Sequence, residues 1–145
     1  MSLDELYKEV ILDHYKAPRN KGPLEGATVS KRKNNPLCGD DIEVHAVLDD
    51  GRVAEISFEG QGCSISQASA SMLTEAVRGK RLEDTDALAG DFRGMMEGRH
   101  EPDEDEFGDL LALKGVVKYP VRIKCAVLAW DVLQDALRDA DASPR

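Results

Sequence analysis

The sequence predicts an α+β domain in which a small three-stranded antiparallel sheet packs against α-helices. Apolar and polar residues alternate through residues 42–48 and 53–59, on either side of the turn Asp49-Asp50-Gly51. Apolar residues at helical spacing precede this block and follow it. A group of strands followed by helices is typical of the α+β class. A length of 145 residues suits one domain, which we expect over residues 1–145.

The N-terminal part is expected to form a helix and then an edge strand. Apolar residues recur every three or four positions up to Tyr15, and Pro18 follows, so this helix should end near Lys16. Residues 27–33 are more polar and are expected to add a third strand at one edge of the sheet. In the hairpin between the other two strands, Gly51 accepts the positive φ that such turns demand.

Helices are expected after the sheet. Gly60-Gln61-Gly62 ends the last strand, and helical spacing then continues up to Gly79. A further helix is predicted over residues 82–88. Residues 90–115 are the least regular part of the chain. Within them, Glu101 to Glu106 contains five acids and a proline, which favours a solvated loop and leaves partner docking as the alternative.

The last predicted element is a helix that begins after Tyr119-Pro120. Cys125 is expected to open this helix, and apolar residues continue at helical spacing as far as Leu137. Asp139 to Arg145 is interpreted as a polar tail. Neither internal repeats nor a linker indicates a second domain.

The composition argues against nucleic-acid and membrane partners. The chain has 19 basic and 28 acidic residues, a formal net charge of −9 and a pI near 4.8. Phosphate binding depends mainly on Lys and Arg, so a nucleic-acid binder is not expected. No apolar stretch approaches the ~20 residues that span a bilayer. Acidic Asp4 and Glu5 stand where a signal peptide carries cations, and a cytoplasmic protein is therefore expected.

The three cysteines are the strongest indication of chemistry. An odd number of cysteines in a cytosolic chain favours metal or thiol chemistry over disulfides. Cys38 lies in a predicted turn between two strands, Cys63 at a strand-to-helix junction, and Cys125 at the start of the last helix. Chain segments at the ends of such elements can converge at one edge of a sheet. Three thiolates with one further donor would complete a tetrahedral zinc site.

Asp40 is the predicted fourth donor, because it follows Cys38 by only two residues. The competing donors are His14, His45 and His100. Of these, His45 is expected to be solvated on the polar face of its strand. Three thiolates and a carboxylate around Zn²⁺ carry a charge of −2, which calls for nearby cations. The candidates lie upstream of Cys38 and of Cys125: Lys31, Arg32, Lys33, Lys118, Arg122 and Lys124.

Three motifs together resemble the IscU/NifU N-terminal family of iron–sulfur cluster assembly proteins. They are Asn35-Pro36-Leu37-Cys38-Gly39-Asp40, Gly60-Gln61-Gly62-Cys63-Ser64-Ile65-Ser66 and Arg122-Ile123-Lys124-Cys125-Ala126-Val127-Leu128-Ala129-Trp130. Within the family the chain resembles the SufU branch. The scaffold branch has a histidine where Lys124 stands, and residues 90–119 are similar to the insertion of the SufU branch.

The resemblance implies a fold, a metal and a reaction. The fold is a three-stranded antiparallel sheet with helices, and the metal is zinc held by Cys38, Asp40, Cys63 and Cys125. Sulfur would come from a pyridoxal-phosphate cysteine desulfurase of the SufS type, with Cys38 as the persulfide carrier and Arg122 engaging the desulfurase. Such a protein is a sulfurtransferase-type relay toward downstream iron–sulfur assembly proteins, not an independent turnover enzyme.

Two alternatives remain open at this point. The same ligands could hold iron, with the protein acting as a scaffold on which a [2Fe–2S] cluster is built. In that case Lys124 offers no neutral donor at the usual histidine position, which favours sulfur transfer. The other alternative is a structural zinc module that only binds partners, although structural zinc sites usually have closely spaced ligand pairs.

Overall fold

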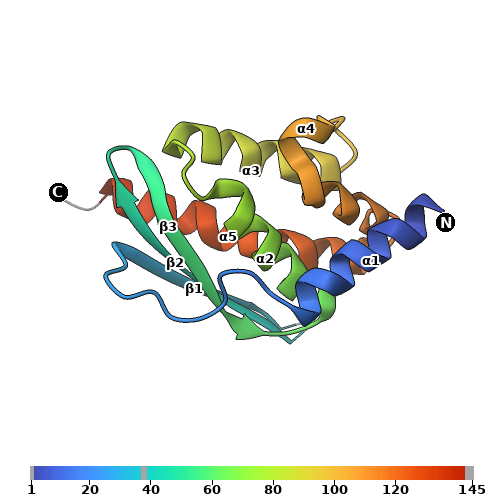
Figure 1. Ribbon diagram of the computed structural model, residues 1–145, viewed down its shortest axis with the longest axis horizontal. Coiled ribbons are helices and arrows are strands. Elements are labelled where there is room, and N and C mark those ends of the chain that lie inside the picture. The colour runs from blue at the N-terminus through green and yellow to red at the C-terminus, as the bar shows by residue number, and fades with distance from the viewer. Residues whose placement is uncertain (1, 37–38, 143–145) are drawn as a thin grey trace.

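The computed structural model of the chain describes residues 2–36 and 39–142. Its three strands form one antiparallel sheet in the order β1-β2-β3, and helices lie on one side of this sheet (Figure 1). The strands are β1 (Val29–Asn35), β2 (Asp40–Asp49) and β3 (Arg52–Gln61). The predicted α+β class is confirmed.

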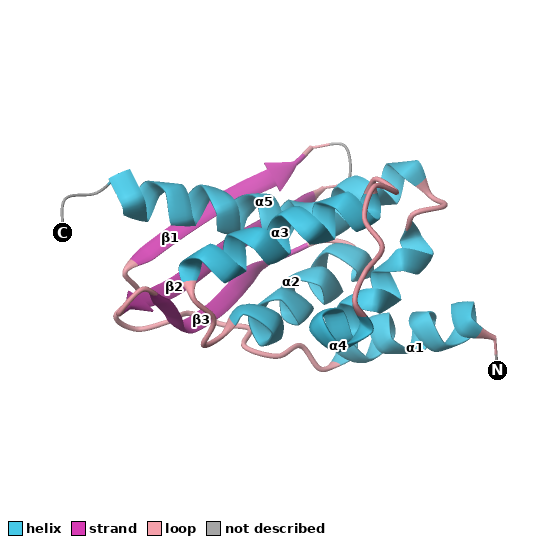
Figure 2. Ribbon diagram, turned by 90° about the horizontal axis from the view of Figure 1, so that it is seen from above, coloured by secondary structure: helices cyan, strands magenta, loops and turns pink. Residues whose placement is uncertain are grey.

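The two helices that cover the sheet position two of the cysteines, Cys63 at the N-cap of one helix and Cys125 within the other. Helix α5 (Pro120–Ala142) packs over β1 and β2, and α2 (Ser64–Val77) packs against β3 and α5 (Figure 2). Alternate side chains of β2, among them Ile42 and Val44, are fully buried beneath them. Trp130 of α5 is also buried and stacks on Phe92, with 4.7 Å between the ring centroids. Burial of this apolar face is the main stabilising contribution to the layer packing.

The N-terminal helix forms as its sequence predicts. Helix α1 (Leu3–Lys16) begins after Ser2, whose Oγ accepts a hydrogen bond from the backbone N–H of Glu5 at 3.2 Å. Near its other end, His14 is buried: its Nδ1 lies 2.8 Å from Ser71 Oγ, and its Nε2 lies 2.8 Å from Asp109 Oδ2. This histidine therefore ties α1 to α2 and to the segment after residue 100.

Residues 90–116 are more regular than the sequence predicts. The helix expected over residues 82–88 continues as α3 (Leu82–Met96), and α4 (Glu104–Phe107) and the 3₁₀-helix η1 (Gly108–Val116) follow it. The acidic run 101–106 is solvated as expected, but its second half is helical. The reason is a cap, because Asp103 Oδ1 accepts a hydrogen bond from the N–H of Asp105 at 2.9 Å.

Two glycines lie inside α3, beyond the residue at which the predicted helix ends. Gly90 and Gly94 look like helix breakers in the sequence, yet both lie inside the helix. Gly94 is buried, and a Cβ added there would stand 2.9 Å from the Cβ of His100. The glycine therefore allows the segment after α3 to fold back closely against the helix.

The last helix also differs from its predicted bounds. It begins at Pro120, so Cys125 lies in its second turn instead of opening it. Proline is favoured at the first helical position, because its missing N–H would have no partner there in any case. The expected polar tail from Asp139 is helical as far as Ala142, and Lys31 of β1 forms an ion pair with Asp139 at 2.7 Å. Within the described residues, none of the helices is long and apolar enough to cross a membrane.

The two glycines of α3 should respond oppositely to alanine. Nothing lies within 4 Å of a Cβ at Gly90, so Gly90→Ala should raise the free energy of unfolding by about 0.5–1 kcal/mol through helix propensity. Gly94→Ala should lower it by about 1–3 kcal/mol through overpacking against His100. Urea unfolding of the two variants measures both values, and a stabilised Gly94→Ala protein would contradict the packing described here.

Candidate metal centre

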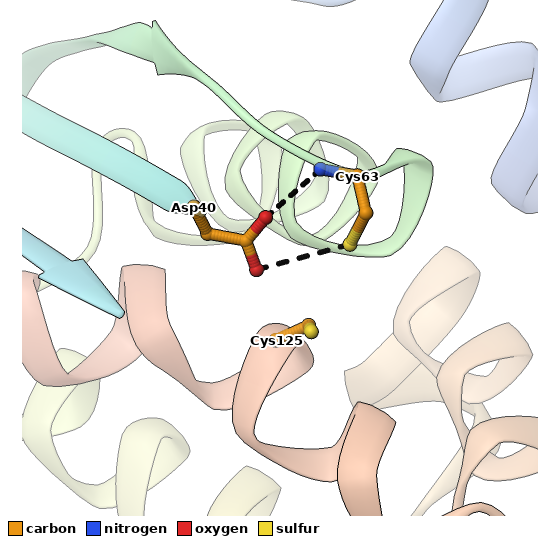
Figure 3. Close-up of side chains that lie close together, drawn as sticks. All are labelled: Asp40, Cys63 and Cys125. Atoms are coloured by element: carbon orange, nitrogen blue, oxygen red, sulfur yellow. Dashed lines mark hydrogen bonds between the residues drawn. The ribbon is translucent and has the colours of Figure 1, made fainter. Parts of the chain in front are cut away.

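Three chemically reactive side chains from three elements meet at one end of the sheet (Figure 3). Asp40 begins β2, Cys63 caps the N-terminus of α2, and Cys125 lies in the second turn of α5. One ligand atom of each lies within 4.8 Å of the others. Asp40 and Cys125 are fully buried, whereas Cys63 is partly exposed. The structure thus brings together three of the four residues predicted from the sequence, and Cys38 lies outside the described residues.

Asp40 and Cys63 are held together by the start of α2. Asp40 Oδ1 accepts a hydrogen bond from the backbone N–H of Cys63 at 2.9 Å, and Cys63 Sγ donates to Asp40 Oδ2 at 3.8 Å. The N–H of Ser66 points at Cys63 Sγ at 3.4 Å, so the sulfur occupies the position that a hydroxyl takes in an ordinary helix cap.

Gly62 makes the close approach of strand and helix possible. Its φ is +155°, and a Cβ there would lie 2.3 Å from Asp40 Oδ1 and 2.8 Å from Ser66 Oγ. Any side chain at this position would therefore push the carboxylate away from Cys63.

Cys125 is positioned by packing between the two covering helices. The residue after it, Ala126, accepts a hydrogen bond through its backbone oxygen from Ser69 Oγ of α2, at 2.6 Å. Both Ser69 and Ala126 are fully buried. This bond fixes α5 against α2 one residue away from the sulfur, and the two cysteine-bearing helices therefore have a defined separation.

Arg122 is the cation that lies beside the sulfurs. A hydrogen bond with Cys125, followed by the electrostatic interactions with Cys63 and then with Cys125, raises the pKa of the Arg122 guanidinium above its usual range. Its side chain is exposed, so its charge lies at the surface of the site.

Four of the other candidate cations are paired with carboxylates elsewhere. Lys31 pairs with Asp139, Arg32 with Asp41, Lys33 with Asp135 and Lys118 with Asp4. Lys124 is exposed. The prediction that these four cations supply counter-charge to the cysteines is therefore wrong, because each of them is paired with a carboxylate outside the site.

Among the described residues, no histidine offers a ligand atom to the group formed by Asp40, Cys63 and Cys125. His14 is occupied by Ser71 and Asp109, and His100 stacks on Phe107 with 6.0 Å between the ring centroids. His45 was expected to be solvated, and this expectation is wrong. Its side chain is only 12% exposed and contacts neighbours on the outer face of the sheet. Asp40 is the oxygen donor that accompanies the two described sulfurs.

Comparison with known proteins places the chain in a family. The family model described as the NifU-like N terminal domain matches residues 6–126. The chain belongs to this family. The resemblance carried by the three cysteine motifs is thereby confirmed.

Two curated relatives and a solved structure match nearly the full chain. The zinc-dependent sulfurtransferase SufU of Bacillus subtilis is 50% identical over 92% of this chain and 90% of that protein. The iron–sulfur cluster assembly scaffold protein IscU of Streptococcus pyogenes is 43% identical over 94% of this chain and 85% of that protein. The crystal structure of a putative iron–sulfur cluster assembly scaffold protein for the SUF system from Fervidobacterium islandicum superposes with a TM-score of 0.85. It is 32% identical and covers 94% of this chain and 99% of that one.

The two contacts of the Asp40 carboxylate can be separated by substitution. Asp40→Ala should lower the free energy of unfolding of the metal-free protein by about 1–3 kcal/mol, because the N–H of Cys63 loses its acceptor. Asp40→Asn keeps an oxygen that can accept the hydrogen bond from the N–H of Cys63, so it should lower the free energy of unfolding by less than Asp40→Ala. Asp41→Ala is the matched control, since it removes only the surface pair with Arg32, worth about 0–1 kcal/mol. Equal losses in Asp40→Ala and Asp40→Asn in denaturant unfolding would show that the hydrogen bond does not matter.

Proposed function

We propose that this protein is a zinc-dependent sulfur acceptor in iron–sulfur cluster assembly. It would take sulfane sulfur from a pyridoxal-phosphate cysteine desulfurase and pass it toward downstream assembly proteins. The observation that carries this proposal is the meeting of the buried Asp40 carboxylate with Cys63 and Cys125. The 50% identity to a protein named as a zinc-dependent sulfurtransferase supports it.

The donor set fits zinc. Zinc ligands at about 2.0–2.3 Å in a tetrahedron lie about 3.3–3.8 Å from one another. Asp40 Oδ2 and Cys63 Sγ are 3.8 Å apart, and the sulfur of Cys125 lies in the same group. Cys38 is the proposed fourth ligand, because only Gly39 separates it from Asp40 in the sequence. When bound, zinc would keep cysteine sulfurs in the thiolate form at neutral pH.

Sulfur transfer from the desulfurase is a thiol–disulfide type of exchange. The Cys38 thiolate attacks the outer sulfur of the desulfurase persulfide and forms a new S–S bond. The original S–S bond breaks, and the desulfurase cysteine leaves as a thiolate. No external oxidant is needed, because the oxidised sulfur itself moves. Cys125 is fully buried, which argues against it as the position of attack.

Arg122 is proposed to engage the desulfurase. Its exposed guanidinium stands beside the two described sulfurs, where an approaching negatively charged group would meet it. Opposite charges at the edge of an interface accelerate association and fix orientation. This role uses the side chain for docking and leaves metal binding to the sulfurs and Asp40.

A [2Fe–2S] scaffold is the second candidate, because the same thiolates and carboxylate can bind iron and relatives are named as scaffolds. Lys124 favours sulfur transfer instead. It is exposed and stands directly before Cys125, and its ammonium group has no lone pair to donate to a metal.

Metal content and colour separate the two candidates. Protein purified without oxygen should be colourless and contain one zinc ion per chain, because its donors complete one tetrahedral site. A brown chromophore with iron and inorganic sulfide would instead favour the scaffold. Asp40→Asn should lose zinc to a chelator faster than wild type, whereas Asp41→Asn should retain it. Unchanged zinc retention in Asp40→Asn would remove Asp40 from the site.

Mass spectrometry after desulfurase turnover locates the transferred sulfur. We expect one additional sulfur on Cys38 and none in Cys38→Ser, because that thiol is the proposed acceptor. Additional sulfur on Cys125 with an unmodified Cys38 would contradict the assignment. Unchanged stimulation of the desulfurase by Cys38→Ser would favour a structural zinc module.

Arg122→Ala should weaken desulfurase stimulation while zinc content stays at the wild-type level. We expect a roughly tenfold higher concentration for half-maximal stimulation, equivalent to about 1.4 kcal/mol. Lys118→Ala is the matched control, since this nearby cation is paired with Asp4. Equal effects of the two substitutions would show that Arg122 has no specific docking role.

A further inference from the structure

A second group of metal-ligand side chains lies on the other face of the sheet. Glu43 and His45 of β2 and Glu59 of β3 each offer a ligand atom, and these atoms lie within 4.8 Å of one another. His45 Nε2 is 2.8 Å from Glu59 Oε2 and 3.6 Å from Glu43 Oε1. Along β2, buried residues alternate with partly exposed ones, and Asp40 belongs to the buried set whereas Glu43 and His45 belong to the other. The two groups are therefore separated by the sheet.

The strand register places two negative charges directly against each other. Glu43 is the cross-strand partner of Glu59, an arrangement that is destabilising for like charges. Arg32 faces Glu43 from β1, but its guanidinium is hydrogen-bonded to Asp41 through Nε and Nη2. With His45 neutral, the three carboxylates of Asp41, Glu43 and Glu59 and the one guanidinium of Arg32 leave a local charge of −2. A divalent cation would neutralise this charge.

The histidine is oriented for coordination. His45 Nδ1 lies 2.7 Å from Ser30 Oγ, which can accept the ring N–H. Metal-binding histidines commonly donate one ring N–H to an oxygen acceptor, and this contact directs the other nitrogen to the metal. Here the other nitrogen, Nε2, is the atom beside the two glutamates. Ser30 is thus a positioning residue for this nitrogen.

A buried hydroxyl and an open space accompany the group. Ser57 is the direct cross-strand partner of His45, so its side chain lies on the same face of the sheet. It is 6% exposed, and its Oγ has no hydrogen-bond partner among the described residues. A cavity of about 230 Å³ is lined by both glutamates together with Arg32, Asp41 and Gly60. This space beside the two glutamates is large enough for an ion with waters.

We propose that Glu43, His45 and Glu59 form a second cation site that binds a divalent first-row ion of the Mn²⁺ or Fe²⁺ type. Two carboxylates and one imidazole are the oxygen and nitrogen donors that such ions accept. The site contains no thiolate, so its selectivity differs from that of the cysteine centre. Binding relieves the repulsion between the paired glutamates and should therefore stabilise the sheet.

Mn²⁺ is the probe, because it favours oxygen and nitrogen donors over thiolates. Free Mn²⁺ is measured by electron paramagnetic resonance during titration of the purified full chain. Wild type should bind one Mn²⁺ per chain, and Glu59→Gln, Glu43→Gln and His45→Gln should each bind it at least roughly tenfold more weakly. Mn²⁺ should also raise the thermal unfolding midpoint of wild type but not of Glu59→Gln.

Two controls make the result specific. Glu55→Gln removes the same charge from the outer face of β3 at a residue paired with Arg78, and it should bind Mn²⁺ like wild type. Cys63→Ser should also retain Mn²⁺ binding, so this result does not depend on the proposed zinc site. The proposal is overturned if wild type binds no Mn²⁺ or if Glu59→Gln binds Mn²⁺ with the same affinity as wild type. It is also overturned if Glu55→Gln loses as much Mn²⁺ affinity as Glu59→Gln. Loss of binding in Cys63→Ser overturns it as well, because the ion would then lie at the cysteines.

Discussion

The geometry of the cysteine centre depends on one buried carboxylate. Asp40 is fully buried between the start of β2 and the N-terminus of α2, where an unpaired charge would be costly. Its Oδ1 is satisfied by the N–H of Cys63, and its Oδ2 faces the Cys63 sulfur. This pair of contacts requires a glycine at position 62, because any larger residue would collide with the carboxylate. The contacts of Asp40 thus determine how the start of β2 meets the N-terminus of α2.

The surrounding layers keep this geometry rigid. Helices α2 and α5 lie together on the buried face of the sheet, and the Ser69–Ala126 hydrogen bond joins them next to Cys125. Trp130, on the same helix as Cys125, stacks on Phe92 of α3 in the core. A site held by packed helices and strands keeps its donors in place better than one held by loops alone. Arg122 is exposed on the same helix and brings a cation to the sulfurs without being part of the core.

The convergence of Asp40, Cys63 and Cys125 was expected from their places at the ends of elements and from the family resemblance. Local patterns in the sequence predicted the sheet and the first two helices, because alternation, glycine placement and helical spacing are properties of neighbouring residues. The predictions that were wrong concern helix bounds and ion-pair partners, which depend on contacts between residues far apart in the sequence. Gly94 looks like a helix breaker until His100 is seen against it, and Lys31 looks like a counter-charge for the cysteines until Asp139 is seen beside it. The proximity of His45 to Glu59 was equally out of reach, since it follows from cross-strand register.

Zinc K-edge X-ray absorption of the native protein tests the central claim most directly, because it counts the atoms around the ion. Our account predicts one four-coordinate zinc with three sulfur neighbours at about 2.3 Å and one oxygen neighbour at about 2.0–2.2 Å. The oxygen should disappear or be replaced by another light atom at a changed distance in Asp40→Ala. A shell of nitrogen and oxygen atoms without sulfur would contradict the account.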